Sequence, residues 1–262
     1  MILFKSVTVI LLKRGGIMVK DHKNLGNFAI FEAFEDNSEC PICELVQKNQ
    51  DRYIDLMYLE WVNDEDFRER LKSEGFCKRH FSILYDKNDK LGLAIILSYM
   101  FSDTLDNMND SMPDVNNKVF TNMLTQKILG KQHTKNDIFS EPQNCIICNY
   151  NESIEQGIIK EIFKLWNKNK EFTDLISNSK GFCMHHSNLM ISNAPKYLKA
   201  DQASNFVNII NSIQRQNLKR IENELHWFIR KFDFRFRNEP WNGTEDSPKR
   251  AINKLMGYII ND

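Results

Sequence analysis

The residues of this sequence best suited to chemistry are its six cysteines, and all of them fall into one pattern that occurs twice. A Cys-x2-Cys pair is followed further along the chain by Gly-Phe-Cys-x2-His. Thiolates together with an imidazole suit Zn²⁺, which takes four ligands in a tetrahedron. We therefore expect two zinc ions, each bound by three cysteines and one histidine. The predicted ligands are Cys40, Cys43, Cys77 and His80 in the first copy, and Cys145, Cys148, Cys183 and His186 in the second.

Other uses of these cysteines remain open. An iron–sulfur cluster with Cys3His ligation is the main competitor of zinc. Disulfides confined to one copy would leave a cysteine over, and a redox Cys-x-x-Cys normally lies in a βαβ context, which we do not expect here. The cysteines could also be small buried hydrophobic residues. Because four protein ligands close a site, Lewis-acid catalysis is not expected, and an enzymatic role is disfavoured.

The spacing leaves the grouping of the ligand pairs undecided. Cys43 and Cys77 are 34 residues apart, which is enough for a helical hairpin that returns its end to its beginning. Each copy filling its own site is the simpler expectation, and exchange of ligands between the copies is the alternative. In the second copy the pattern selects His186 in preference to the neighbouring His185.

The two copies correspond over more than their ligands. Cys40 to Cys43 matches Cys145 to Cys148 at an offset of 105 residues, and Gly75 to His80 matches Gly181 to His186 at an offset of 106. Phe67 and Leu71 also have counterparts, in Phe172 and Ile176. A duplicated unit of this kind predicts two related halves. We assign residues 24–112 to the first copy, 113–144 to a connecting segment, and 145–262 to the second copy with a C-terminal helical extension.

The elements that must position these ligands are expected to be helices throughout. Glycine and proline are scarce, and apolar residues recur at helical intervals without an alternating strand pattern. A helix is expected to begin beside each ligand pair, with Pro41 at the first position of one and Gly75 and Gly181 just before two others. The other predicted helices are a short one capped by Asn63 and running to Lys72, an amphipathic one with its apolar face from Leu93 to Leu105, one over Ile159–Trp166, a long one over 203–236, and a last one from Ser247 to Met256 that ends at Gly257. The sequence therefore predicts an all-α protein.

The apolar start of the chain does not resemble a signal peptide. Its charges, Lys13 and Arg14, follow the apolar run, and about a dozen apolar residues cannot span a membrane. Lys13 to Gly16 is what a ribosome-binding sequence gives when it is translated, so we expect translation to begin at Met18 and residues 1–17 to be a mis-annotated extension. We expect a cytoplasmic protein with reduced thiols.

The motifs also resemble a known family. Cys40-Pro-Ile-Cys43-Glu-Leu, Arg68 to Leu71 and Gly75 to His80 are similar to segments of a bacterial domain of unknown function that is common in Gram-positive anaerobes. Phe232 to Arg235 and Asp246 to Ile252 resemble the ending of that family. The second copy departs from the pattern, since Ile146 replaces the proline and Met184-His185 replaces Lys78-Arg79. The resemblance implies a metal-bearing helical protein and gives no activity.

The charge balance limits the partners. Lys and Arg total 35, as do Asp and Glu, which argues against a DNA-binding protein or an anionic-membrane binder. The segment Arg230–Arg237 mixes cations with phenylalanines and could bind RNA. We favour the interpretation that it is a helix end whose phenylalanines enter the core. An unidentified protein is therefore the expected partner of a binding or adaptor protein, and a redox or metal-sensing protein is the alternative.

Overall fold

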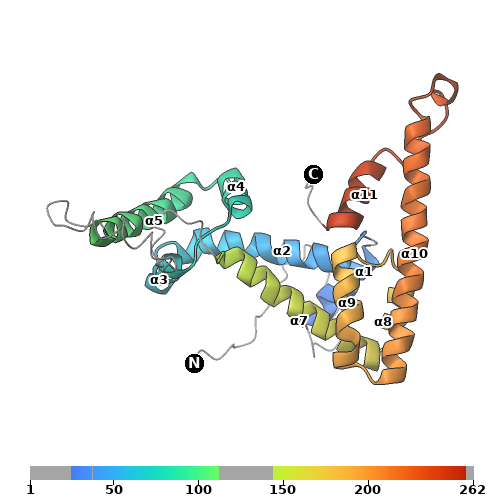
Figure 1. The fold of residues 1–262 in the computed structure, drawn as a ribbon, viewed down its shortest axis with the longest axis horizontal. Helices are drawn as coiled ribbons and strands as arrows, with labels where there is room; N and C mark the ends of the chain where they lie inside the picture. The colour runs from blue at the N-terminus through green and yellow to red at the C-terminus, as the bar shows by residue number, and fades with distance from the viewer. Residues whose placement is uncertain (1–24, 37, 112–143, 258–262) are drawn as a thin grey trace, which may run out of the picture. The chain divides into compact units, whose positions relative to one another are not determined.

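The computed structural model describes residues 25–36, 38–111 and 144–257. In these residues every named secondary-structure element is a helix, and the only β pairing is an isolated bridge between Gly75 and Cys145 (Figure 1). The all-α prediction is confirmed. The predicted extension 1–17 and residues 113–143 of the predicted connecting segment lie outside the described residues. None of the described helices is long and apolar enough to cross a membrane. The α-helices are α1 (Leu25–Glu35), α2 (Pro41–Leu56), α3 (Glu65–Ser73), α4 (Lys78–Asp86), α5 (Lys90–Ser111), α7 (Ile146–Lys168), α8 (Lys170–Ser177), α9 (Met184–Tyr197), α10 (Ala200–Arg230) and α11 (Ser247–Met256); Met57–Trp61 is a π-helical turn and Phe234–Phe236 a 3-10 turn.

The chain divides into two compact units. Unit 1 comprises residues 1–49 and 153–262, and unit 2 comprises residues 50–152. The boundaries fall inside α2 and α7, so each of these helices contributes residues to both units. The units differ from the segments 24–112 and 145–262 that we assigned to the two copies, because unit 1 combines the beginning of the first segment with most of the second.

The core of unit 1 is built from both ends of its sequence. The ring of Phe34 in α1 lies 5.2 Å from that of Phe172 in α8 and 5.9 Å from that of Phe182. Phe206 of α10 packs edge-on against Trp166 of α7, with ring centroids 4.8 Å apart. The contacts of Phe34 bury the apolar face of α1 against residues that lie more than 130 positions further along the chain, such as Phe172.

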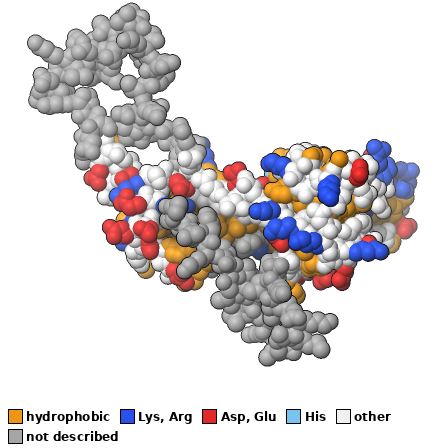
Figure 2. Space-filling view, turned by 90° about the horizontal axis from the view of Figure 1, so that it is seen from below, with side chains coloured by type: hydrophobic (Ala, Val, Ile, Leu, Met, Phe, Trp, Pro, Cys, Tyr) orange, Lys and Arg blue, Asp and Glu red, His pale blue; other side chains and the backbone are white. Residues whose placement is uncertain are grey.

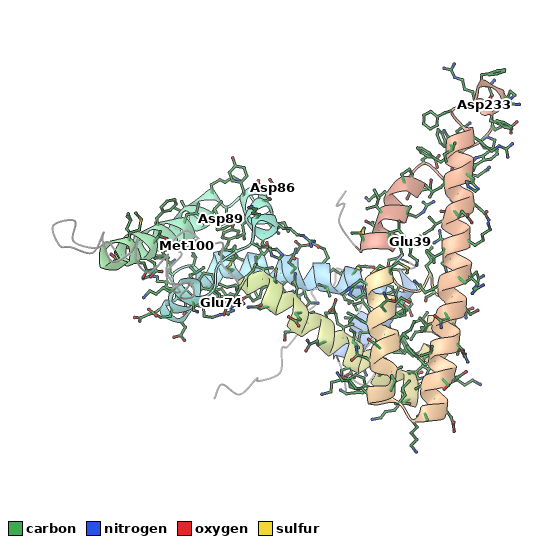
Figure 3. All side chains as sticks on the ribbon, in the orientation of Figure 1. Glu39, Glu74, Asp86, Asp89, Met100 and Asp233 are labelled. Carbon is green, nitrogen blue, oxygen red and sulfur yellow. The ribbon has the colours of Figure 1, made fainter. Side chains whose placement is uncertain are left out.

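The long helix α10 is shorter at its C-terminus than the sequence predicts. It ends at Arg230. The side-chain amine of the next residue, Lys231, donates hydrogen bonds to the carbonyl oxygens of Phe236 and Arg237, both at 2.9 Å. Asp233, labelled in Figure 3 beyond the end of α10, accepts a hydrogen bond from the backbone of Arg235. Apolar residues recur along one face of this helix; they are buried from Phe206 to Ile221, and beyond Ile221 this face leaves the core.

The phenylalanines beyond α10 are therefore not core residues. Phe232 is 75% exposed and Phe234 is 85% exposed. Our preferred interpretation of Arg230–Arg237, a helix end whose phenylalanines enter the core, is wrong for these two side chains. The reason is that the backbone leaves the helix at Arg230 and closes a local turn around Lys231 before the rings can reach the core.

In unit 2, the end of α2 packs with α3, α4, α5 and the start of α7. Met57, Leu84, Ile96 and Ile146 are completely buried there. The predicted apolar face of α5 holds only in its first half, since Leu93 and Ile96 are buried whereas Phe101 is 65% exposed and Leu105 is 57% exposed.

Several helix ends follow the sequence prediction closely. α2 begins at Pro41, and α11 ends at Gly257, whose φ of 84° suits glycine. The cap of α3 is Asp64, one residue later than the predicted Asn63, and its carboxylate accepts a hydrogen bond from the backbone of Phe67. Asn169 caps α8 in the same way through Phe172.

Candidate metal centres

The eight predicted ligands gather into two groups, but the pairs are exchanged between the two copies. We call them site 1 and site 2. Site 1 lies in unit 1 and consists of Cys40, Cys43, Cys183 and His186. Site 2 lies in unit 2 and consists of Cys77, His80, Cys145 and Cys148. Within each group the ligand atoms all lie within 4.8 Å of one another.

The expectation that each copy fills its own site is therefore wrong. Each Cys-x2-Cys pair lies at the start of a helix, α2 or α7, and each Cys-x2-His pair lies where α4 or α9 begins. Spacing alone satisfies both groupings, and long-range contacts between the ligand-bearing segments select the exchanged one.

In unit 2 the selecting contact is a short backbone bridge. The N–H of Gly75 donates to the carbonyl of Asn144 at 2.9 Å, and the N–H of Ile146 donates to the carbonyl of Gly75 at 3.0 Å. This pairing places the segment leading to Cys77 against the segment that carries Cys145. It satisfies backbone groups that would otherwise be unpaired beside the site.

Unit 1 cannot form the same bridge, because Pro41 occupies the position that corresponds to Ile146 and has no N–H. The amine of Lys254 in α11 joins the two segments instead. It donates to the carbonyl of Glu39 at 3.0 Å and also to the carbonyl of Lys180. Lys254 is completely buried. A side chain from the C-terminal helix thus takes the place of a backbone bridge.

Ion pairs also anchor the segment that leads to Cys40. The carboxylate of Glu39 accepts two hydrogen bonds from the guanidinium of Arg220 in α10, at 2.8 and 2.7 Å (Glu39 is labelled in Figure 3). Arg250 of α11 pairs with Glu224 of α10 at 2.8 Å. The segment before Cys40 is therefore anchored to α10 and, through Lys254, to α11.

The geometry of site 1 is that of four ligands around a single point. The Nδ1 atom of His186 lies 3.3 Å from the sulfur of Cys40 and 3.2 Å from those of Cys43 and Cys183. The sulfurs of Cys43 and Cys183 are 3.6 Å apart, well beyond the roughly 2.05 Å of a disulfide.

Site 2 has nearly the same dimensions. The Nδ1 atom of His80 lies 3.2 Å from the sulfurs of Cys77 and Cys145 and 3.3 Å from that of Cys148. The sulfurs of Cys77 and Cys148 are 3.8 Å apart, and all six cysteines are free. Each group could hold one metal ion.

The second ring nitrogen of each histidine has a different partner. The Nε2 atom of His186 lies 2.7 Å from a carboxylate oxygen of Glu155, whereas the Nε2 atom of His80 lies 3.1 Å from the amide oxygen of Gln50. An acceptor at Nε2 holds the ring proton there, so that in the neutral ring, the form that binds a metal, the Nδ1 lone pair faces the sulfurs. Our sequence reasoning missed both partners. A signal existed, since Gln50 and Glu155 are related by the same offset of 105 residues.

His185 does not join the sulfur groups. Its side chain is 60% exposed, and its Nε2 atom lies 3.2 Å from the same carboxylate oxygen of Glu155. Glu155, His185 and His186 form a third group of possible ligand atoms, but the Nδ1 atom of His186 faces the cysteines. The pattern's choice of His186 over His185 therefore agrees with the geometry.

The two sites differ in burial and in electrostatics. All four ligands of site 1 are buried, whereas in site 2 Cys148 is exposed and Cys77 is partly exposed. Burial lowers the pKa of the His80 imidazole to about 4, and Arg79 acts in the same direction. Burial opposes the charged form of His186 as well, but its hydrogen bonds to Cys183, Cys43 and Glu155 prevail and raise its pKa to about 11. Burial and neighbouring thiols raise the pKa of Cys148 to about 12.

Comparison with known proteins identifies relatives without a described activity. The chain is 22% identical over 203 residues to an uncharacterized 23.9 kDa protein in the xynA 3′ region of Caldicellulosiruptor sp. (strain Rt8B.4), over 75% of this chain and 89% of that protein. No solved structure matches. A family model described as a family of unknown function (DUF6062) matches residues 22–262, and the chain therefore belongs to this family.

Proposed function

We propose that this protein is a non-enzymatic binding or adaptor protein held together by two structural zinc ions, one in site 1 and one in site 2. The observation that supports this most is that three sulfurs and one imidazole nitrogen surround a single point in each site. Four protein ligands complete the tetrahedron that zinc prefers and leave no position for a substrate.

The distances favour a single ion in each site. A tetrahedral ion with Zn–S bonds of about 2.3 Å separates two sulfur ligands by about 3.8 Å. The sulfurs of Cys43 and Cys183 in site 1 are 3.6 Å apart, and those of Cys77 and Cys148 in site 2 are 3.8 Å apart. A [4Fe–4S] cluster binds each of its four protein ligands through a different iron atom and so requires a wider spread of ligands. Zinc therefore fits the donor groups better than the cluster does.

In this proposal zinc contributes folding energy and supplies no chemistry to a substrate. Site 1 joins Cys43 to Cys183 across 140 residues, and site 2 joins Cys77 to Cys148 across 71 residues. Binding a metal only in the folded state stabilises that state. Thiolate ligands require reduced cysteines, which we expect in the cytoplasm. The partner that the helices bind is proposed to be another protein.

Metal analysis of the anaerobically purified full-length chain tests the proposal. We expect a colourless protein in which inductively coupled plasma mass spectrometry finds about two zinc ions per chain, because each site takes one ion. Brown protein with iron, sulfide and absorbance near 400 nm would instead establish the redox alternative.

RNA is a second candidate partner, which the exposure of Phe232 and Phe234 favours. Arg230 and Lys231 precede these two rings and Arg235 follows them, and exposed rings beside cations can stack on unpaired bases. Against this, Asp233 pairs with Arg235 at 2.6 Å. On the face that Figure 2 shows, seen from below, basic and acidic side chains of the described residues are interspersed with hydrophobic and neutral ones, as the equal totals of cations and anions predict.

Fluorescence anisotropy with a labelled single-stranded RNA tests this second candidate. RNA binding through the end of α10 predicts salt-dependent binding that the double variant F232A/F234A weakens at least tenfold, since each stacked base contributes about 1–3 kcal/mol. Phe101→Ala removes an exposed phenylalanine from α5 and is the matched control. Equal binding by all three proteins, or no binding, excludes RNA at this surface.

A further inference from the structure

Sites 1 and 2 bind their ions with the same ligand types but in different surroundings. We infer that site 2 is an exchangeable metal site, which gives up its ion to a competing chelator or thiol, whereas site 1 retains its ion. This inference rests on the proposed zinc sites: both ions stabilise the fold, and the ion of site 2 in addition exchanges with metal-binding molecules in the surroundings.

The first reason is access. Exchange of a thiolate-bound ion begins when an incoming ligand reaches the metal and displaces one of the cysteines. Cys148 is exposed and Cys77 is partly exposed, so an incoming ligand can approach site 2 from the side of these sulfurs. In site 1, Cys40 is 1% exposed and Cys183 is completely buried.

The second reason is that α11 covers site 1. A Cβ atom added to Gly257, at the end of this helix, would lie 3.4 Å from the sulfur of Cys43 and 3.8 Å from that of Cys183. The backbone at the end of α11 therefore passes close to two of the ligand sulfurs. Lys254, one turn earlier, fixes the helix to the carbonyls of Glu39 and Lys180. A competing ligand has to displace α11 before it can reach an ion in site 1.

The third reason is the partner of each histidine. A carboxylate hydrogen-bonded to the outer nitrogen of a ligand histidine makes the ring a stronger donor to the metal than a neutral amide does. His186 has the carboxylate of Glu155 and His80 has the amide of Gln50. Loss of such a partner changes metal affinity by about 10- to 100-fold.

A charge beside site 1 also favours retention of its ion. Zn²⁺ with three thiolates and a neutral imidazole carries a net charge of about −1. The buried ammonium group of Lys254 lies close enough to Cys40 and Cys183 to interact with their charges. A cation at this position stabilises the metal-loaded form of site 1.

Competition with the chromogenic chelator 4-(2-pyridylazo)resorcinol tests the inference. Full-length protein is first shown to contain two zinc ions, then mixed with excess chelator while the coloured complex is recorded. We expect two phases of equal amplitude, with one ion released at least tenfold faster than the other. Cys148→Ser should abolish the fast phase, and Cys183→Ser should abolish the slow phase, because each variant empties one site.

A reciprocal exchange of the histidine partners separates their effect from that of burial. Gln50→Glu gives site 2 a carboxylate and should slow the fast phase, whereas Glu155→Gln should speed the slow phase, each by about tenfold or more. The carboxylate in Gln50→Glu can still accept the hydrogen bond that Asn151 now donates to Gln50. Circular dichroism of both variants shows whether the helices are preserved.

The outcomes are distinguishable. Release of both ions in one phase, or a slow phase that disappears in Cys148→Ser, overturns the inference while the zinc sites themselves stand. Protein purified without zinc refutes the proposed function, and the inference is then refuted with it.

Discussion

At the residue scale, Pro41 and Ile146 show how one substitution changes the way in which a site is built. Ile146 donates a backbone hydrogen bond to Gly75 and thereby joins the two ligand-bearing segments of site 2. Pro41 cannot donate, so the corresponding segments of site 1 are joined through Lys254. A buried ammonium group is unusual in a protein interior, and here its hydrogen bonds to two carbonyls compensate for its burial.

Replacing Lys254 by methionine tests this role. Lys254→Met keeps the length of the side chain but leaves the carbonyls of Glu39 and Lys180 without their donor. We expect a loss of about 1–3 kcal/mol in unfolding free energy and weaker zinc binding at site 1. Removal of the buried charge offsets part of the loss. Denaturant unfolding and zinc titration measure the two effects.

Lys219→Met is the control for this substitution. Lys219 lies on the surface of α10 and pairs with Glu222, so its loss should change stability by less than about 0.5 kcal/mol. Unchanged zinc binding at site 1 in Lys254→Met, together with unchanged stability, would show that Lys254 does not join the segments.

The eight candidate ligands could be predicted from the sequence, because all six cysteines and two of the histidines fall into one spacing pattern that occurs twice. The partners Gln50 and Glu155 were not predicted, since a glutamine or glutamate on a helix is ordinary unless its place opposite a histidine is known. The burial of Lys254 could not be predicted from the sequence either, because it depends on where α11 packs against the rest of unit 1.

At the scale of elements, the helix boundaries marked by proline or glycine followed from the sequence better than the other boundaries did. Pro41 begins α2 and Gly257 ends α11 as predicted, since proline and glycine act through local backbone geometry. The end of α10 and the outer half of α5 were predicted wrongly. Apolar residues such as Phe101 and Phe232 continue the helical period there without a neighbouring element to cover them in the described part of the chain.

Gly181 and Gly157 differ in whether the structure requires a glycine: the backbone conformation at Gly181 requires one, and the helical conformation at Gly157 does not. Gly181 precedes the Cys-x2-His pair of site 1 with a φ of 74°, and an added Cβ atom would lie 2.6 Å from Gln214 and 2.9 Å from Ile213. We expect Gly181→Ala to lower stability by more than about 1 kcal/mol, because both the backbone and the contacts would be strained.

Gly157 is the matched position, since it lies in α7 with no atom within 4 Å of an added Cβ atom. Gly157→Ala should therefore raise stability by about 0.5–1 kcal/mol. Thermal unfolding of both variants, followed by circular dichroism, measures the opposite shifts in Tm. Shifts of the same sign would contradict the assigned backbone role of Gly181.

At the scale of the whole molecule, the grouping of the ligands is the feature that the sequence left undecided. Spacing constrains each pair internally but says nothing about which pairs meet. That choice depends on contacts between distant residues, such as the ring of Phe34 against that of Phe182 and the bridge between Gly75 and Asn144. Long-range packing of this kind has no local sequence signal.

The zinc content of two double variants tests the exchanged grouping most directly. Cys40→Ser with Cys183→Ser removes two ligands of site 1, so this protein should retain about one zinc ion per chain at site 2. Cys40→Ser with Cys77→Ser damages both sites and should bind no zinc. If instead the Cys40/Cys77 variant keeps one ion and the Cys40/Cys183 variant keeps none, each copy fills its own site and the grouping described here is wrong.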